Sequence, residues 1–220
     1  MLWSYSQAVE LFLFLGAVLG ISVSGAMAPG PVTAVTIAKG HDSSKEGLFI
    51  ALGHGIVEVP LIIAIALGLS VVFKHPWWKF FIGIVGGGFL VYMGATMIRD
   101  RHSMAAGEQK VAMGSLPAGA VTSMSNPYFF VWWATAGAAL VTKSLTWGVI
   151  GVGLFIVAHW VVDLAWYWFL TFMTYHGKKA LNPKIQSGVF ACCGIFLVSF
   201  GLYFLLDGSG ALEKLGTLLA

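Results

Sequence analysis

Two histidines in this chain each stand four residues before a carboxylate, His54 before Glu58 and His159 before Asp163. In an α-helix this spacing places both side chains on one face, a single turn apart. An imidazole beside a desolvated carboxylate can take up and release a proton near neutral pH, as a proton-coupled carrier requires. Two imidazoles and two carboxylates also form a donor set for zinc, manganese, nickel or iron. A third interpretation is structural, with the pairs fixing helix packing.

The sequence around these four residues is strongly apolar. Of 220 residues, 58% are hydrophobic and 10% are charged, with a mean hydropathy of +0.87, whereas a soluble domain carries about 25% charged residues. The composition therefore excludes a soluble enzyme and predicts that the lipid bilayer is the solvent. Ionised groups in contact with lipid are costly, so we expect all four side chains to face a helix bundle or an aqueous cavity.

Length and apolar patterning predict an all-α polytopic membrane protein with six transmembrane helices and no separate soluble domain, since a crossing takes about 20 residues. The predicted spans are 11–38, 47–72, 80–98, 116–141, 145–175 and 185–206. Glu58 and Asp163 then lie well inside the second and fifth spans.

The first and fourth predicted spans are too long for one straight helix. The 28 residues of 11–38 would run about 42 Å, against roughly 30 Å of hydrocarbon. Pro29, Gly30 and Pro31 are predicted to break the first span, and Asn126 with Pro127 the fourth, because proline removes a backbone donor. Gly30, between Pro29 and Pro31, permits unusual backbone conformations. We expect these five residues to bind the substrate, since helix starts offer free N–H groups to an anion and Asn126 adds an amide.

The chemistry recurs in the same order in both halves. Lys39 precedes His54 by 15 residues, and Lys143 precedes His159 by 16. A repeat of three spans is odd in number, so the second copy must enter the membrane from the opposite side. Inverted repeats with interrupted helices are the architecture of many secondary transporters.

The repeat divides the chain into residues 1–100, a hydrophilic connecting loop at 101–115, and a second repeat with a short tail at 116–220. The loops after spans one, three and five carry eight of the 12 Lys and Arg residues, and the other side carries four. The positive-inside rule then predicts that both termini lie outside the cell (inner) membrane.

Other functions find less support. Lys and Arg stand singly, which argues against a nucleic-acid partner, and neighbouring Cys192 and Cys193 fit packing better than a disulfide. An intramembrane hydrolase would need a nucleophile such as Ser22 or Ser24 near His54, without a supporting motif. The nine Trp residues are expected mostly at the membrane interfaces. No cofactor is expected, and a homo-oligomer stays open.

Several short motifs resemble the lysine exporter (LysE/RhtB) family over nearly the whole chain. They are Ala28-Pro29-Gly30-Pro31, Gly47 with Ala51-Leu52-Gly53, and Ser125-Asn126-Pro127. The resemblance implies six spans, an inverted repeat, and export of amino acids or similar small solutes by proton exchange. The two His-carboxylate pairs depart from the general pattern and resemble a subgroup of unassigned substrate. Related branches export metal cations or carry electrons through paired cysteines, so a divalent-metal exporter and, remotely, a thiol conduit are alternatives.

Overall fold

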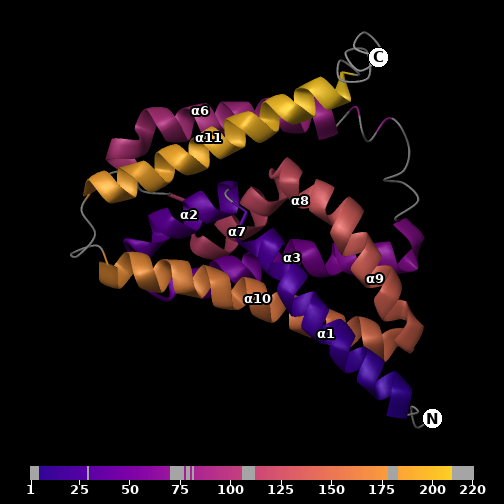
Figure 1. Ribbon diagram of the computed structural model, residues 1–220. Coiled ribbons are helices and arrows are strands. Elements are labelled where there is room, and N and C mark those ends of the chain that lie inside the picture. Colours follow the sequence, from indigo (N-terminus) through magenta and orange to yellow (C-terminus); the bar gives the residue numbers. More distant parts are fainter. Residues whose placement is uncertain are drawn as a thin grey trace.

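The structure, a computed structural model, describes residues 5–28, 30–69, 77, 80, 82–105, 112–177 and 183–209. In these residues the regular secondary structure is all helical and contains no strand. The predicted all-helical class is therefore confirmed for the described chain. Figure 1 shows α6 and α11 side by side along one side of the molecule, α1 and α10 on the opposite side, and α2, α3, α7 and α8 between them.

The helices fall into two sets along the chain. The first set is α1 (Tyr5–Ala26), α2 (Pro31–Gly40), α3 (Glu46–Ala64), the π-helical turns η1 (Ile65–Leu69) and η2 (Ile82–Gly86), and α6 (Gly87–Ala105). The second set is α7 (Ser115–Met124), α8 (Pro127–Trp132), the π-helical turn η3 (Trp133–Gly137), α9 (Ala138–Ser144), the 3-10 turn η4 (Leu145–Trp147), α10 (Gly148–Gly177) and α11 (Pro183–Gly208).

Both predicted helix breaks are present. α1 ends at Ala26 and α2 begins at Pro31, while α7 ends at Met124 and α8 begins at Pro127. Each proline takes the first helical position, where a missing N–H costs nothing. Gly30 has φ −169° and ψ −173°, an extended conformation open to any residue, so this break does not use the conformational freedom of glycine.

The apolar helices are long enough for a membrane. Within the described residues, three helical runs meet the length and composition for a crossing: Tyr5–Ala26, Glu46–Gly68 and Tyr128–Gly177. The last run has 50 residues and turns at Gly148, whose φ of 62° lies in the left-handed region that favours glycine. Phe190–Leu206 is a shorter apolar helix. The count of six spans stays a prediction.

The directions of the packed helices follow from their contacts. α3 runs parallel to α7, and α1 runs parallel to α10, because paired residues follow the same order along both helices. The pairs are Glu46 with Ser115 and His54 with Ser123, then Phe14 with Phe155 and Ser22 with His159. α6 runs antiparallel to α11, with Gly87 against Gly201 and Gly94 against Gly194.

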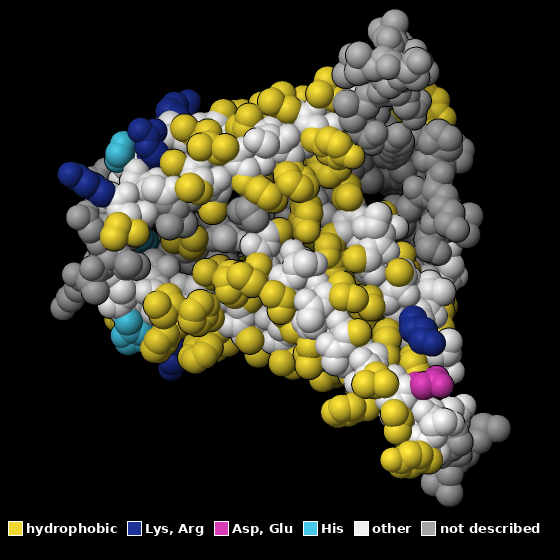
Figure 2. Space-filling model, in the orientation of Figure 1, with side chains coloured by type: hydrophobic (Ala, Val, Ile, Leu, Met, Phe, Trp, Pro, Cys, Tyr) yellow, Lys and Arg dark blue, Asp and Glu magenta, His cyan; other side chains and the backbone are white. Residues whose placement is uncertain are grey.

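The visible surface is banded as a membrane protein requires. Figure 2 shows apolar side chains across the middle of the molecule, and most of the Lys, Arg and His side chains in view lie at the edge where α10 ends and α11 begins. A Lys or Arg side chain also lies near an Asp or Glu toward the opposite edge. α6 continues to Ala105, past the predicted end of its span at residue 98, and carries Arg99 paired with Asp100 at 2.9 Å. The first residues of the predicted connecting loop at 101–115, as far as Ala105, are therefore helical.

Candidate functional site

A cavity lies where the two helix breaks face the middles of α3 and α10. It contains about 450 Å³ of empty space, its open mouth included. Its lining comes from six elements: Gly25, Ala26, Ala28, Gly30, Val32, Thr33, His54, Glu58, Asn126, Tyr128, Phe129, Trp132, Trp133, His159, Asp163 and Tyr167.

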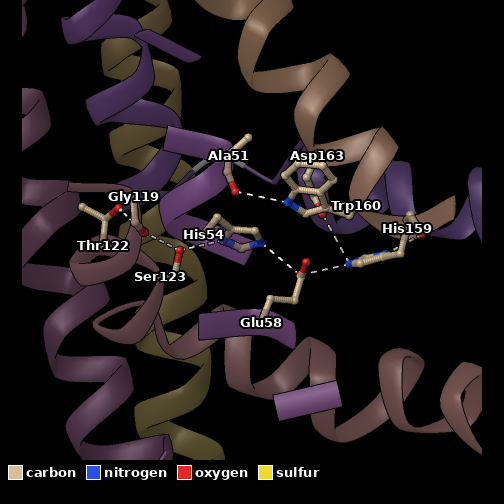
Figure 3. Close-up of polar contacts among 10 residues, drawn as sticks. Ala51, His54, Glu58, Gly119, Thr122, Ser123, His159, Trp160 and Asp163 are labelled. Carbon is tan, nitrogen blue, oxygen red and sulfur yellow. Dashed lines mark hydrogen bonds and ion pairs between the residues drawn. The ribbon is translucent and has the colours of Figure 1, made fainter. Parts of the chain in front are cut away.

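The four predicted acid and imidazole side chains meet in the wall of this cavity. One oxygen of Glu58, Oε1, lies 3.0 Å from His54 Nε2 and 3.0 Å from His159 Nε2. Asp163 Oδ2 lies 3.4 Å from the same nitrogen of His159. All four residues are at most 5% exposed, and Figure 3 shows the two imidazoles approaching Glu58 from opposite sides. Two helices from different halves of the chain thus share one carboxylate oxygen.

Glycines let α3 reach this position. A Cβ added at Gly55 would lie 2.6 Å from Trp160 Nε1 on α10, and one added at Gly53 would strike the backbone of Leu116 on α7. Small residues allow such close helix approach in lipid. Because these glycines flank His54, the imidazole is held at the contact among α3, α7 and α10.

Each imidazole is also bound by a serine. Ser123 Oγ on α7 lies 2.6 Å from His54 Nδ1, and Ser22 Oγ on α1 lies 2.6 Å from His159 Nδ1. Both serines are fully buried. Sequence reasoning missed Ser123, and it considered Ser22 only as a neighbour of His54, whereas the structure places it against His159. The shared direction of α1 and α10 makes this pairing, and no sequence motif marks it.

Two carboxylate oxygens in the cluster have no hydrogen-bond partner among the described residues. Glu58 Oε2 and Asp163 Oδ2 are both buried, and both residues line the cavity. Asp163 Oδ2 keeps the 3.4 Å ion-pair contact with His159 Nε2. Leaving a buried acceptor unpaired is costly. These oxygens are therefore positioned to receive a hydrogen-bond donor or a cation that enters the cavity.

Aromatic rings enclose the histidines. Trp132 stacks on His159 with ring centroids 5.2 Å apart, and Trp133 meets the same ring edge-on at 5.2 Å. Tyr167 approaches His54 edge-on at 5.6 Å. The expectation that tryptophans mostly lie at membrane interfaces was wrong for Trp132 and Trp133, which are buried and line the cavity. Their adjacency to the Pro127 break was the available signal.

The break residues predicted to bind substrate are placed as follows. Gly30 is the N-cap of α2 and lies beside Asn126, whose Nδ2 would be 3.4 Å from a Cβ added at Gly30. Asn126 Oδ1 accepts a hydrogen bond from the Tyr128 N–H at 3.1 Å and so caps α8. Pro31 is buried at the start of α2. Pro127 begins α8, and Pro29 lies outside the described residues.

The donor set also has metal-binding geometry. His54, Glu58 and Asp163 each offer an atom within 4.8 Å of the other two, and imidazole with carboxylate suits several divalent transition metals. Cys192 is exposed and Cys193 half-buried on α11, and the cavity is lined by other residues.

Comparisons with known proteins agree with this arrangement. The model of the family described as LysE type translocator matches residues 23–208. The chain is 25% identical over 203 residues to the "Putative amino acid efflux protein YcgF" of Bacillus subtilis (strain 168), covering 87% of this chain and 93% of that protein. No solved structure matches. The match spans both helix breaks and both histidine-carboxylate pairs, and this chain belongs to the LysE type translocator family.

Proposed function

We propose that this chain is a secondary transporter that exports an amino acid or a related small metabolite in exchange for protons. One observation carries the proposal: imidazoles from two halves of the chain share one oxygen of Glu58 in the wall of a cavity formed by two helix breaks. Membership of a translocator family and the relative's printed function support export of this class of cargo.

The cavity offers complementary ends to a zwitterion. The N-terminus of α2 has no side-chain cap, and its Val32 and Thr33 line the cavity, so backbone N–H groups and the helix dipole favour a carboxylate there. The Asn126 amide lies beside the same break. Glu58 Oε2, which has no hydrogen-bond partner among the described residues, supplies an acceptor for an ammonium group. The aromatic wall provides apolar surface for the rest of the cargo.

The same cluster supports coupling to protons. Glu58 cannot serve a cargo ammonium and two imidazoles equally, because all three compete for one carboxylate. Arrival of a proton weakens the hold on a cation, and departure of the proton restores it. Export driven by proton entry follows when the two events occur on opposite sides of the membrane.

The packing directions support an inverted repeat. α3 pairs in parallel with α7, and α10 pairs in parallel with α1, as expected when the second half repeats the first upside down. The antiparallel pair of α6 and α11 would then lie across the pseudo-symmetry axis. The basic edge in Figure 2 supports a cell-membrane protein with that edge in the cytoplasm and both termini outside.

A divalent transition metal is the second candidate cargo. It is favoured by the three ligand atoms within 4.8 Å of one another. Against it, Glu58 Oε1 already lies 3.0 Å from two imidazole nitrogens, and a metal would have to displace both. The sharing of that oxygen therefore favours the proton over the metal.

Flux measurements in proteoliposomes test the proposal directly. Vesicles loaded with radiolabelled leucine, threonine or lysine, or with Zn²⁺ or Mn²⁺, are diluted into acidic or neutral buffer. We expect an amino acid to leave faster into acidic buffer, with alkalinisation of that buffer. Metal efflux without amino-acid efflux would replace this function with the metal alternative, and protein-free vesicles provide the baseline.

A further inference from the structure

The two histidines of the cluster differ in how their serines are bonded. Ser123 Oγ donates to the Gly119 carbonyl oxygen at 2.6 Å and also lies 2.6 Å from His54 Nδ1. A hydroxyl group carries a single hydrogen. Since that hydrogen goes to Gly119, Ser123 Oγ must accept from the imidazole, and His54 carries a hydrogen on Nδ1. Figure 3 shows this series of polar contacts from Gly119 through Ser123 and His54 to Glu58.

Ser22 is in a different position. Among the described residues its hydroxyl has one hydrogen-bond partner, His159 Nδ1 at 2.6 Å. A buried hydroxyl hydrogen needs an acceptor, and donation from Ser22 to Nδ1 satisfies it. His159 then carries its hydrogen on Nε2 and donates it to Glu58 Oε1 at 3.0 Å. The neutral form of His159 fits an ionised Glu58 without any added proton.

The neutral form of His54, in contrast, does not fit an ionised Glu58. With a hydrogen on Nδ1, a neutral His54 has a lone pair on Nε2, which faces Glu58 Oε1 at 3.0 Å. A lone pair and an ionised oxygen at that distance repel each other, so one proton must lie on either atom. The His54–Glu58 contact therefore needs one proton in addition to those of a neutral imidazole and an ionised carboxylate. The His159–Glu58 contact needs no additional proton.

We propose that Ser123 and Ser22 are positioning residues that hold the two histidines in opposite tautomers, and that the coupling proton is held between His54 and Glu58. The location of the coupling proton rests on the proposed function, but the tautomers do not. On loading, a proton from water bonds to His54 Nε2 or Glu58 Oε1. On release it returns to water on the other side, and no other bond changes.

The surroundings of His54 agree with this asymmetry. α10 presents His159, Asp163 and Tyr167 to the cluster, α3 presents Glu58, and α8 presents the Phe129 ring, whose centroid lies 5.5 Å from that of His54. Asp163 approaches the His159 side, at 3.4 Å from its Nε2. A second carboxylate therefore strengthens the need for an Nε2 hydrogen on His159.

Nitrogen-15 NMR of histidine-labelled protein in lipid nanodiscs tests the tautomers without any transport assay. Signals are assigned by loss in His54→Asn and His159→Asn. We expect a hydrogen on Nδ1 of His54, alone or with one on Nε2, and a hydrogen on Nε2 alone for His159. A hydrogen on Nε2 alone for His54, or the same neutral tautomer for both, would overturn the proposal.

Serine variants test the positioning role. Ser123→Ala removes the acceptor for His54 Nδ1, so the His54 signal should shift to the Nε2 form, and proton-driven efflux should fall about tenfold, the effect of one hydrogen bond on an equilibrium. Ser123→Thr, which keeps the hydroxyl, should restore both readouts. Ser22→Ala should leave the His54 signal unchanged.

The outcomes separate this inference from the proposed function. If the NMR pattern is as expected but flux is not linked to protons, the proposed function is wrong and the tautomer assignment holds. Proton-linked flux with an unchanged His54 signal in Ser123→Ala would end the positioning role and keep the function.

Discussion

Gly94 of α6 and Gly194 of α11 lie back to back, each against the backbone carbonyl of the other. A Cβ added at Gly94 would sit 2.5 Å from Gly194 O, and one added at Gly194 would sit 2.7 Å from Gly94 O. In lipid, helices associate through such close packing of small residues. A second contact of this kind, between Gly87 and Gly201, lies seven residues away along each helix. The two contacts join α6 and α11, the last described helices of the two halves.

The first prediction concerns this contact. Gly94→Ala forces two backbones apart and should lower the free energy of unfolding by on the order of 1–3 kcal/mol, measured as a fall in melting temperature in detergent. Gly88→Ala is the matched control on the same helix, because a Cβ there meets nothing within 4 Å. Equal melting temperatures for the two variants would contradict the packing role.

A second prediction concerns Glu58. Glu58→Gln keeps the shape of the side chain but removes the charge that two imidazoles face, so transport should be abolished while the protein still folds. Asp163→Asn should have a weaker effect, since its nearest imidazole nitrogen is 3.4 Å away. Glu10→Gln makes the same chemical change at an exposed residue of α1 and serves as the control. Efflux from proteoliposomes with gel-filtration profiles of each variant provides the measurement.

Asn126 allows a third prediction that separates two roles of one side chain. Asn126→Ala removes the cap of α8 and should cost about 1 kcal/mol of stability. Asn126→Asp keeps the capping oxygen but loses the amide donor and adds a negative charge beside the α2 N-terminus. We expect Asp to restore stability and to raise the KM for cargo. Normal KM in Asn126→Asp would restrict Asn126 to capping.

The fourth prediction is the effect of metal removal. If protons drive export, EDTA on both sides of the vesicle membrane should leave amino-acid efflux unchanged, and purified protein should contain no stoichiometric transition metal by mass spectrometry. Tightly bound metal together with loss of flux in EDTA would favour the ligand set of His54, Glu58 and Asp163 as a metal site.

Orientation gives a fifth prediction. In a background with Cys192 and Cys193 replaced by alanine, a cysteine at Thr146 should react with an impermeant maleimide in intact cells. A cysteine at Ser43 should react only after permeabilisation, because the positive-inside rule places the basic loop around it in the cytoplasm. The opposite labelling pattern would invert the proposed topology.

The sequence predicted the parts of the site that depend on local geometry. His54 with Glu58 and His159 with Asp163 follow from a four-residue spacing on a helix, and the two breaks follow from proline chemistry. The contacts of Ser22 and Ser123 could not be predicted, because they depend on which helices run parallel and in what register. The burial of Trp132 and Trp133 depends likewise on how α8 and η3 pack against α10, whereas composition alone suggests a membrane interface.

Both imidazoles contact one oxygen of Glu58, so the carboxylates of the two halves, Glu58 and Asp163, have different places in the site although the helices that carry them pack in a similar way. Two identical copies of the first half, assembled as a dimer, would bring two glutamates to the centre in place of Glu58 and Asp163. Both glutamates would then occupy the position between the two histidines, and two negative charges placed so close together repel each other. A glutamate between the two histidines and an aspartate at one side of them thus require two halves of different sequence. A symmetric homodimer of either half could not reproduce this arrangement.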